Sequence, residues 1–435
     1  MDRMRINRRQ LLGLFGSLGA GSVLAASGIG RAVAGNQPPR ITVIGGGFGG
    51  ATAAKYLKRF DPSVHVTLIE PSRRYYTCPF SNLYLGGLYD FEDLGHGYRE
   101  LARDYGVQVI HSTATDIDTE QRTVTLAGDE TLRWDRLILS PGIDIRWGEL
   151  EGYTRDAAEL APHAWKAGPQ THLLKKQLES MEDGGTFILV APQDPFRCPP
   201  GPYERVSMVA NYFKNHKPKS KILLLDAKDN FSKQPLFQQG WQENYGDMIE
   251  WVSRSNDGTV IRVDAANREV ETEFGTRHKA DVLNVVPPQK AGFIADRAGV
   301  TDDSGWVPIE PRTFRSPQAD GVYVIGDATQ AAPMPKSGFV ANTQGKSVAA
   351  AVLADLAGEE TPDPSWANTC YSTIAPGYGI SVAGVYGVRD GEIEEFSGGI
   401  SPEDADGEFR RKEAEHAVAW YEAIAQDTWG TYQEG

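Results

Sequence analysis

The three cysteines of this 435-residue chain have the residue type and the surroundings for redox chemistry. Cys78 follows two tyrosines and a threonine, Cys198 lies in a proline-rich turn after an apolar run, and Cys370 lies far toward the C-terminus. A thiolate is a nucleophile, and two cysteines exchange an electron pair when they make or break a disulfide. One cysteine beside a cofactor and two that pair across the chain would suit such chemistry. The elements around them decide the interpretation.

A glycine-rich turn predicts that the chain binds a dinucleotide. Residues 40–44 have the pattern of a buried strand, residues 51–60 of an alanine-rich helix, and residues 65–70 of a second strand. In such a unit the first glycine permits the tight turn, the second lets the backbone approach a pyrophosphate, and the third packs the helix against the strand. These glycines are Gly45, Gly47 and Gly50. Glu70, at the end of the second strand, is placed to bind ribose hydroxyls.

Two later segments favour FAD over NAD as the dinucleotide. Residues 135–142 resemble the strand and turn at which two-domain flavoproteins leave their first FAD-binding segment, and Pro141 and Gly142 form the turn. Residues 321–327 resemble the late strand whose aspartate, here Asp327, holds the ribityl and pyrophosphate region. We therefore expect an FAD-binding domain that is split between residues 35–150 and 284–358.

The residues between these two pieces, 151–283, predict a second Rossmann-like domain. Its first two strands are expected at residues 185–191 and 221–226. The turn after the first strand, residues 192–201, carries prolines where nicotinamide-binding proteins have a second glycine fingerprint. Proline has no backbone N–H and a fixed φ, so this turn cannot wrap a pyrophosphate in the usual way. We therefore expect no nicotinamide site and an electron donor other than NAD(P)H.

The first 34 residues predict an export signal. Arg8 and Arg9 precede a weakly apolar stretch, rich in glycine and alanine, that ends in Ala-Val-Ala. Twin-arginine signals export proteins that have already folded around a cofactor, so the expected location is the periplasm. An N-terminal membrane anchor is the alternative.

The charge of the chain excludes one class of partner. Residues 1–34 hold five arginines and one aspartate, so their removal lowers the net charge from −14 to −18. Such a surface repels phosphate backbones, and we expect no nucleic-acid partner. The acidic surface either steers a basic partner or reflects a saline or alkaline habitat.

Residues 359–435 predict a third, C-terminal domain. Its final helix carries an apolar stripe that is expected to pack onto the FAD domain, made of Ala417, Trp420, Tyr421 and Ile424. The expected fold class is therefore α/β, with two Rossmann-like domains of the two-dinucleotide-binding flavoprotein type and a C-terminal α+β domain.

Four segments together resemble the flavoprotein subunit of flavocytochrome c sulfide dehydrogenase. The family lies in the superfamily of FAD-dependent pyridine nucleotide-disulfide reductases and sulfide:quinone oxidoreductases. The segments are residues 75–78, 195–204, 333–338 and 368–371, and the second is long and idiosyncratic. The resemblance covers essentially the whole chain after residue 34.

The resemblance implies a covalent FAD that is attached from the sulfur of Cys78 to the flavin 8α-methyl carbon. It also implies a Cys198–Cys370 disulfide over the isoalloxazine ring, which hydrosulfide would attack to give a persulfide and a thiolate. Electrons would then pass through the flavin to a dihaem c-type cytochrome subunit. Haem c would belong to that partner only, and no metal site is expected in this chain.

Further residues are candidates near the flavin. Glu204 is placed to move a proton from the incoming sulfur, with a surface carboxylate on the following helix as the alternative. Lys336 is expected to lead a helix N-terminus toward the flavin pyrimidine ring, where its charge and the helix dipole would stabilise reduced flavin. Trp420 and His163 are candidates for the pocket wall or, alternatively, for the core.

Three other functions stay open from the sequence. A sulfide:quinone oxidoreductase shares the fold and the cysteine pair, but a membrane platform would favour basic flanks that this C-terminus lacks. An NADH dehydrogenase of this fold would need the second glycine fingerprint, and a non-enzymatic chaperone for sulfur or haem would not need a flavin site. Pro79 and Phe80 also follow Cys78 where less rigid residues are expected, which could alter the flavin edge that faces a cytochrome.

Overall fold

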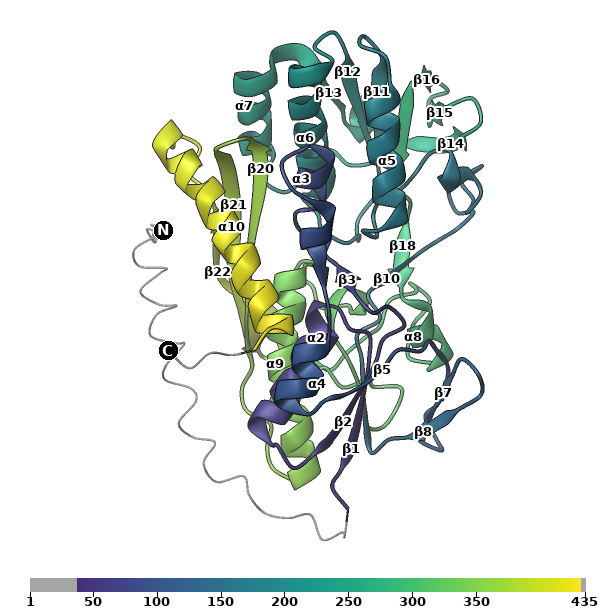
Figure 1. Cartoon of the computed structure of the whole chain (residues 1–435), viewed down its shortest axis with the longest axis vertical. Helices are drawn as coiled ribbons and strands as arrows, with labels where there is room; N and C mark the ends of the chain where they lie inside the picture. The colour runs from purple at the N-terminus through teal and green to yellow at the C-terminus, as the bar shows by residue number, and fades with distance from the viewer. Residues whose placement is uncertain (1–36, 432–435) are drawn as a thin grey trace.

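The computed structural model describes residues 37–431, which form two stacked units of sheet and helix with a C-terminal sheet beside them (Figure 1). The expected export signal at residues 1–34 lies outside the described residues. The lower unit in Figure 1 is built on a five-stranded parallel sheet with the order β19-β9-β1-β2-β5. Its strands are β1 (Arg40–Ile44), β2 (His65–Ile69), β5 (Gln108–Ile110), β9 (Arg136–Leu139) and β19 (Val322–Val324).

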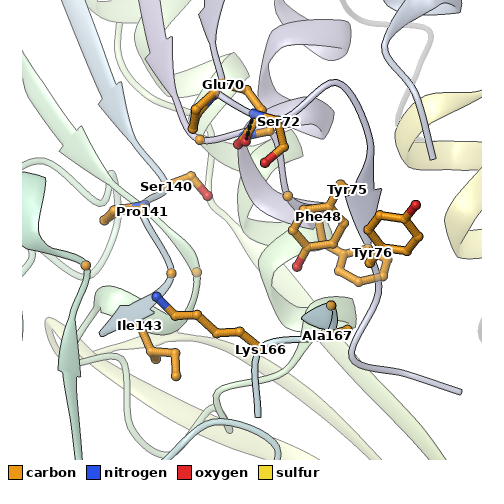
Figure 2. Close-up of a pocket in the computed structure, with 18 of the residues that line it drawn as sticks. Phe48, Glu70, Ser72, Tyr75, Tyr76, Ser140, Pro141, Ile143, Lys166 and Ala167 are labelled. Carbon is orange, nitrogen blue, oxygen red and sulfur yellow. Dashed lines mark hydrogen bonds between the residues drawn. The ribbon is translucent and has the colours of Figure 1, made fainter. Parts of the chain in front are cut away.

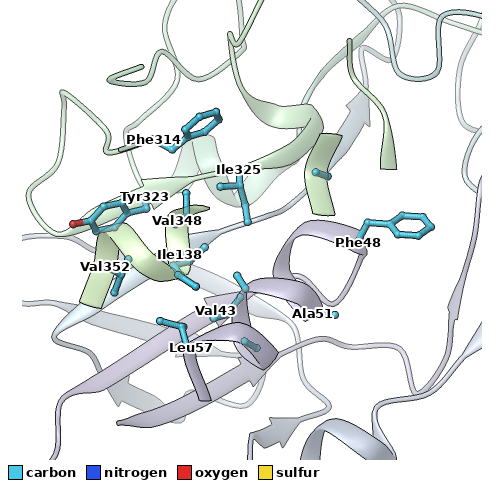
Figure 3. Close-up of a cluster of buried hydrophobic side chains, with 14 of the residues drawn as sticks. Val43, Phe48, Ala51, Leu57, Ile138, Phe314, Tyr323, Ile325, Val348 and Val352 are labelled. Atoms are coloured by element: carbon cyan, nitrogen blue, oxygen red, sulfur yellow. The ribbon is translucent and has the colours of Figure 1, made fainter. Parts of the chain in front are cut away.

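Helices α2 (Phe48–Phe60) and α9 (Gly338–Ala357) pack closely on each other in this unit. Small residues allow the approach: a Cβ on Gly345 of α9 would lie only 2.6 Å from the carbonyl oxygen of Gly49 in α2. Apolar side chains from the sheet and both helices then form one buried cluster, as Figure 3 shows for Val43, Leu57, Ile138, Ile325, Val348 and Val352. Burial of this cluster holds α2 against the sheet and thereby fixes the position of the glycine turn between β1 and α2.

The second unit has a four-stranded parallel sheet with the order β13-β12-β11-β17. Its strands are β11 (Thr186–Ala191), β12 (Lys221–Asp226), β13 (Ile249–Val252) and β17 (Val282–Val285). Its helices are α5 (Pro169–Ser180), α6 (Gly201–His216) and α7 (Gln234–Tyr245). The expected domain boundary between residues 283 and 284 is therefore misplaced, because it cuts through β17, whose residues 282–285 pair with β11.

Short strands connect and decorate the two units. The antiparallel pair β10 (Ile143–Ile145) and β18 (Gln289–Ala291) lies where the chain passes between the units (Figure 1). The small antiparallel ladders are β3 (Tyr75–Tyr76) with β4 (Gly95–His96); β6 (Ala114–Asp118), β7 (Thr123–Leu126) and β8 (Thr131–Arg133); and β14 (Val260–Asp264), β15 (Glu269–Thr272) and β16 (Arg277–Lys279). The short helices are α3 (Ser81–Leu85), α4 (Arg99–Tyr105), α8 (Phe293–Arg297), and the 3₁₀ turns η1 (Phe91–Leu94), η2 (Ala157–Glu159), η3 (Gly246–Met248), η4 (Arg254–Asn256) and η5 (Gly326–Ala328).

The C-terminal segment is an antiparallel sheet covered by one long helix. The sheet consists of β20 (Ser365–Ala375), β21 (Tyr378–Arg389) and β22 (Glu392–Ile400), and the helix is α10 (Gly407–Trp429), yellow in Figure 1. The expected apolar stripe faces inward: Ala417, Tyr421 and Ile424 are buried, and Trp420 is partly buried. The fold class predicted from the sequence is confirmed. Within residues 37–431, no helix is long and apolar enough to cross a membrane.

The end of α10 is fastened to the lower unit. Buried Lys55 of α2 donates from Nζ to the carbonyl oxygens of Asp427 and Gly430, at 2.7 Å each. A cation at a helix C-terminus satisfies carbonyl groups that lack partners inside the helix. The indole of Trp429 donates to the carbonyl oxygen of Gly46 at 3.1 Å. The C-terminal segment therefore contacts the glycine turn directly.

Candidate functional site

The glycine turn has the geometry that the sequence predicts for it. Gly45 has a φ of +101°, and a Cβ there would overlap the carbonyl oxygen of Ser140. A Cβ on Gly50 would overlap the carbonyl oxygen of Gly45, so the strand-to-helix packing excludes any larger residue. The turn and the first residues of α2 line a cleft of about 940 Å³. Amides at a helix N-terminus that face such a cleft are suited to a pyrophosphate.

Glu70 stands at the end of β2 and lines the same cleft (Figure 2). Its Oε2 accepts from the amide of Gly46 and its Oε1 from the amide of Ser72, at 2.9 Å each. The carboxylate therefore holds the glycine turn in place. Each carboxylate oxygen keeps a lone pair for a ligand hydroxyl, which is the role expected for an acid that binds the adenosine ribose.

The second half of the cleft comes from the two late FAD segments. Pro141 and Gly142 line it, and Gly142 has a φ of +64° that favours glycine. Asp327 in η5 also lines it, and its buried Oδ1 has no hydrogen-bond partner. Burial raises the pKa of Asp327, and Arg197 acts in the opposite direction. A buried acceptor without a donor fits a ribityl or ribose hydroxyl, so the residues present fit FAD.

All three cysteines line a second cavity, of about 270 Å³. This sulfur cavity shares residues with the FAD cleft, including Tyr75, Arg197 and Asp327. Phe48 belongs to both cavities as well, and Figure 2 shows it beside Tyr75. A flavin whose adenosine lies near Glu70 would therefore reach the sulfur cavity with its ring end.

The thiols are free in this structure, and the expected Cys198–Cys370 bridge is not formed. The thiols of Cys78 and Cys198 interact, and each shifts the pKa of the other. The interaction with Cys198 is the main cause that lowers the pKa of Cys78 to about 6, and Arg197 lowers it further. Cys370 comes from β20, and its Sγ lies 3.7 Å from the carbonyl oxygen of Tyr371. All three thiols line one cavity, and none of them is bonded to another. The pairing of Cys198 with Cys370 therefore stays a prediction.

The backbone at Cys198 is unusual. Its φ of +59° is uncommon for a residue with a side chain, and such conformations concentrate at functional sites. Its amide donates to the carbonyl oxygen of Lys336 at 2.9 Å, and its own carbonyl accepts from the amide of Gly201 at 2.8 Å. The turn after β11 is thereby pinned to the segment that precedes α9. Its neighbour Arg197 has a buried Nε without a hydrogen-bond partner.

Glu204 lies on α6 and is only partly exposed, so the surface alternative is wrong. Its Oε2 accepts from Asn82 Nδ2 at 2.8 Å, and its Oε1 accepts from the amide of Thr373 at 2.9 Å. Burial raises the pKa of the carboxyl, and these two hydrogen bonds oppose the rise. A carboxylate with a raised pKa that is bonded to the strand of Cys370 suits proton transfer, and that role stays a prediction.

Lys336 immediately precedes Ser337, whose hydroxyl caps the N-terminus of α9 at 3.1 Å from the amide of Val340. The expected position of Lys336 before a helix is therefore confirmed, and the residue lines the sulfur cavity. Its Nζ donates to the carbonyl oxygens of Asp327 and Thr329, at 2.8 and 2.7 Å. Burial lowers its pKa to about 8. Its action on a flavin ring stays a prediction.

The two candidates for the pocket wall separate in the structure. Trp420 lines the sulfur cavity, and its buried Nε1 has no hydrogen-bond partner. His163 is not among the residues that line either cavity. Its Nδ1 accepts from the amide of Trp165 at 3.0 Å, and burial lowers its pKa to about 3, so His163 is a core residue.

Sequence reasoning did not identify Tyr75, Phe48 and Arg197 as shared lining of the two cavities. Arg197 had a signal, because it stands next to Cys198 in the most idiosyncratic segment. The aromatic residues had none, since tyrosine and phenylalanine are equally at home in a core. Phe80, which follows Cys78 and Pro79, has a φ of +69° and stacks on Tyr421 with ring centroids 4.5 Å apart.

In the second unit, the acid at the end of β12 makes its contacts within the chain. Asp226, at the end of β12, is fully buried and accepts from the hydroxyl of Tyr203 at 2.6 Å. It also pairs with Lys228 at 2.6 Å. The ring of Phe231 stacks on Tyr203 with centroids 3.6 Å apart. Asp226 is therefore engaged in buried structural contacts.

Three family models match parts of the chain. The model of the pyridine nucleotide-disulphide oxidoreductases matches residues 39–178. The model for the central part of the sulfide dehydrogenase [flavocytochrome c] flavoprotein chain matches residues 171–287. The model for the flavin-binding part of flavocytochrome c sulphide dehydrogenase matches residues 362–429.

Individual relatives agree with these models. The sulfide dehydrogenase [flavocytochrome c] flavoprotein chain of Chlorobaculum thiosulfatiphilum is 63% identical over 43 residues, which are 10% of this chain and 90% of that sequence. The mitochondrial sulfide:quinone oxidoreductase of Mus musculus is 23% identical over 304 residues, or 66% of this chain and 65% of that protein. The relative of the same name from Dictyostelium discoideum is 20% identical, and this chain again spans 65% of its length.

Solved structures share the fold. The sulfide:quinone oxidoreductase of Aquifex aeolicus superposes with a TM-score of 0.67 at 18% identity, over 89% of this chain and 92% of that one. The putidaredoxin reductase–putidaredoxin complex gives a TM-score of 0.62 at 16% identity, over 90% of this chain and 94% of the matched chain. The FAD cleft, the sulfur cavity beside it and the matching family models agree with one another. The chain therefore belongs to the flavocytochrome c sulfide dehydrogenase flavoprotein family, within the FAD-dependent pyridine nucleotide-disulfide oxidoreductase superfamily.

Proposed function

We propose that this protein is the flavoprotein of a periplasmic sulfide dehydrogenase, which oxidises hydrosulfide and passes the electrons to a c-type cytochrome. The observation that carries the proposal is the sulfur cavity, where Cys78, Cys198 and Cys370 converge beside the FAD cleft. The families and relatives that the chain matches are named for sulfide oxidation, which supports the same substrate.

The chemistry starts from an oxidised Cys198–Cys370 pair. Hydrosulfide attacks one sulfur, the S–S bond breaks, one cysteine carries the persulfide and the other becomes a thiolate. The proton of hydrosulfide passes to the Glu204 carboxylate, which is bonded to the amide of Thr373 on the strand of Cys370. The bound flavin supplies a two-electron acceptor. When the electron pair has left and the disulfide re-forms, the added sulfur atom departs in the zero-valent state.

Cys78 is the residue that would hold the flavin covalently. The interaction with the Cys198 thiol, together with Arg197, lowers the pKa of the Cys78 thiol to about 6, which favours the thiolate form. A thiolate is the form required for a carbon–sulfur bond. A covalent tether would keep the cofactor in place after export, where free FAD is not available to replace it. Export itself rests on the twin-arginine pattern of residues 1–34.

The C-terminal helix favours a cytochrome over a membrane quinone as the electron acceptor. The apolar side of α10 packs on β21 and α2, with Tyr421, Ile424 and Trp429 all buried. A helix that docks on a membrane needs its apolar side free and its polar side basic. The acidic surface of the chain would instead attract a basic protein partner. The number of haems on that partner is proposed from family resemblance alone.

A soluble electron donor such as NADH is not expected to reduce this flavin. The buried Asp226 contacts and the Tyr203–Phe231 stack support this proposal, as do the prolines that flank Cys198. The test is stopped-flow mixing of the purified holoprotein with hydrosulfide, NADH or NADPH in separate runs. Hydrosulfide should bleach the flavin absorbance, and added cytochrome c should restore it. Rapid bleaching by NADH, or none by hydrosulfide, would refute the proposal.

A further inference from the structure

Lys233 occupies a position that several physical preferences oppose. It is the residue before α7, its φ is +63°, and only 4% of it is exposed. The positive end of the helix dipole disfavours a cation at a helix N-terminus. A left-handed backbone is strained for a residue with a side chain, and burial of an ammonium group is unfavourable as well. Such local conflicts are expected mainly where function compensates them.

The contacts of Lys233 lead to one of the three cysteines. Its Nζ donates to the hydroxyl of Ser372 at 2.8 Å and to the carbonyl oxygen of Cys370 at 3.3 Å. Both acceptors belong to β20, and Cys370 lines the sulfur cavity. The ammonium group of the second unit is therefore tied to the segment of the C-terminal sheet that carries the redox thiol.

Glu204 is hydrogen-bonded to the next residue of the same strand. Its Oε1 accepts from the amide of Thr373, while Lys233 holds Ser372. Two residues of opposite charge, one from α6 and one at the start of α7, thus fix consecutive residues of β20. These two contacts hold β20 in place and thereby fix the position of Cys370 relative to the turn that carries Cys198.

The charges around Cys370 have a clear pattern. Burial raises its thiol pKa, Glu204 and Cys78 act in the same direction, and Lys233 lowers it. Burial in turn lowers the pKa of Lys233, whereas Cys370, Glu204, Cys198 and Glu413 of α10 raise it. Lys233 is thus the cation that opposes the anionic groups at Cys370.

We propose that Lys233 is a positioning residue of the sulfur site, which holds the Cys370 segment of β20 and stabilises negative charge on the Cys370 sulfur. The inference rests on the proposed sulfide oxidation. When hydrosulfide splits the Cys198–Cys370 bond and its proton moves to Glu204, one cysteine carries a persulfide anion and the other a thiolate. Cys370 bears one of these charges whichever sulfur is attacked, so its charge needs a fixed counter-ion.

The experiment measures the ionisation of the Cys370 thiol directly. Reduced holoprotein is pulsed with iodoacetamide over a series of pH values, and alkylation of the Cys370 peptide is quantified by mass spectrometry. In Lys233→Met the profile should move to higher pH by about one unit, which slows alkylation below the thiol pKa about tenfold. Lys233→Arg should restore most of the rate.

The matched control is Lys217→Met. Lys217 is another buried lysine that donates to backbone carbonyls, those of Glu179 and Met181, and it belongs to neither cavity. Its replacement should leave the Cys370 profile where it is in the wild type. If a buried lysine affected the Cys370 profile only by stabilising the fold, Lys233→Met and Lys217→Met would have the same effect on that profile.

An unchanged Cys370 profile in folded Lys233→Met would overturn the inference. Should that variant fail to fold, Ser372→Ala carries the same test, because it removes the hydroxyl that holds Nζ: a shift to higher pH supports the role and no shift refutes it. Alkylation requires no sulfide. A wild-type flavin that hydrosulfide does not reduce would therefore refute the proposed function, while the alkylation profile still decides the action of Lys233 on Cys370.

Discussion

The turns that follow β1 and β11 occupy equivalent places in two similar units, but they are built from residues with opposite properties. The first turn consists of glycines and leaves backbone amides facing a cleft of about 940 Å³. The second turn consists of prolines around Arg197 and Cys198, and Lys228 lies over the ring of Phe196 with Nζ 4.9 Å from its centroid. Both turns lead into a helix, α2 in the first case and α6 in the second.

This difference shows how one architecture can serve two chemical roles. A turn without side chains lets a phosphate approach the helix N-terminus. A turn with a rigid backbone and a cysteine instead presents a sulfur. The hydrogen bond from the Cys198 amide to the carbonyl oxygen of Lys336 holds this turn beside the segment before α9, at the edge of the FAD cleft. The second unit has kept its sheet and helices as a scaffold for one side of the sulfur cavity.

The largest effect is expected from a methyl group added to the first turn. In Gly50→Ala the new Cβ would overlap the carbonyl oxygen of Gly45, so the helix cannot pack on the strand. We expect loss of bound flavin and of most soluble protein, measured by the ratio of flavin to protein absorbance. Gly407→Ala is the control, because a Cβ there meets nothing within 4 Å. A yellow, stable Gly50→Ala protein would show that this turn does not set the cofactor site.

Serine in place of Cys198 in the second turn, or of its expected partner Cys370 on β20, should instead leave a yellow but inactive protein. Cys198→Ser and Cys370→Ser should each abolish flavin reduction by hydrosulfide, because neither variant can form the disulfide that is attacked. A purely structural bridge predicts another result: its loss would cost roughly 2–5 kcal/mol. The melting temperature would then fall while folded protein still turned over sulfide. Turnover per flavin and thermal melting, measured on the same samples, distinguish the two cases.

Cys78 should decide whether the flavin stays with the protein under denaturing conditions. Wild-type protein that is precipitated with acid should keep its yellow colour, and one flavin-bearing peptide should contain Cys78. In Cys78→Ala the flavin should pass into the supernatant. Complete release from the wild type would refute the tether, although the noncovalent cleft around Glu70 and Asp327 would be unaffected.

A smaller effect is expected from Glu204→Gln, which keeps the shape of the side chain. General acid–base catalysis contributes about 10²- to 10⁴-fold, so turnover should fall within that range. Wild-type turnover should decline as the pH falls through the Glu204 pKa, because the protonated carboxyl accepts no proton. Burial raises this pKa, so the decline should lie above the ordinary range of a glutamate. In Glu204→Gln this acid limb should disappear, whereas exposed Glu243→Gln should keep it.

The first unit could be predicted from the sequence in most of its detail. The pattern of residues 40–70 indicated both strands and the helix between them, and the glycines indicated the turn. Local rules suffice there because the strands are short apolar runs and the turn requires glycine. The boundary near residue 283 was misplaced, because β17 is a single buried strand whose partner, β11, lies about 95 residues earlier in the chain.

The residues of the sulfur site could be predicted from the sequence, but the contacts between them could not. The family resemblance implied that Cys78, Cys198 and Cys370 belong to one site, and Glu204 was placed there by its spacing from Cys198. Neither could show that the Cys198 thiol interacts with Cys78. Lys233 was missed for a related reason. A lysine in a loop is normally exposed, and its burial depends on β20, which comes from a distant part of the chain.

The bond from Trp429 to the carbonyl oxygen of Gly46 has a consequence for biosynthesis. The two residues lie 383 positions apart, and Lys55 secures the same helix end through the carbonyl of Gly430. A ribosome that has completed the first unit has therefore made the glycine turn without the contact that closes over it. Tight uptake of the flavin should follow release of the finished chain, and cofactor content would then report that translation reached α10.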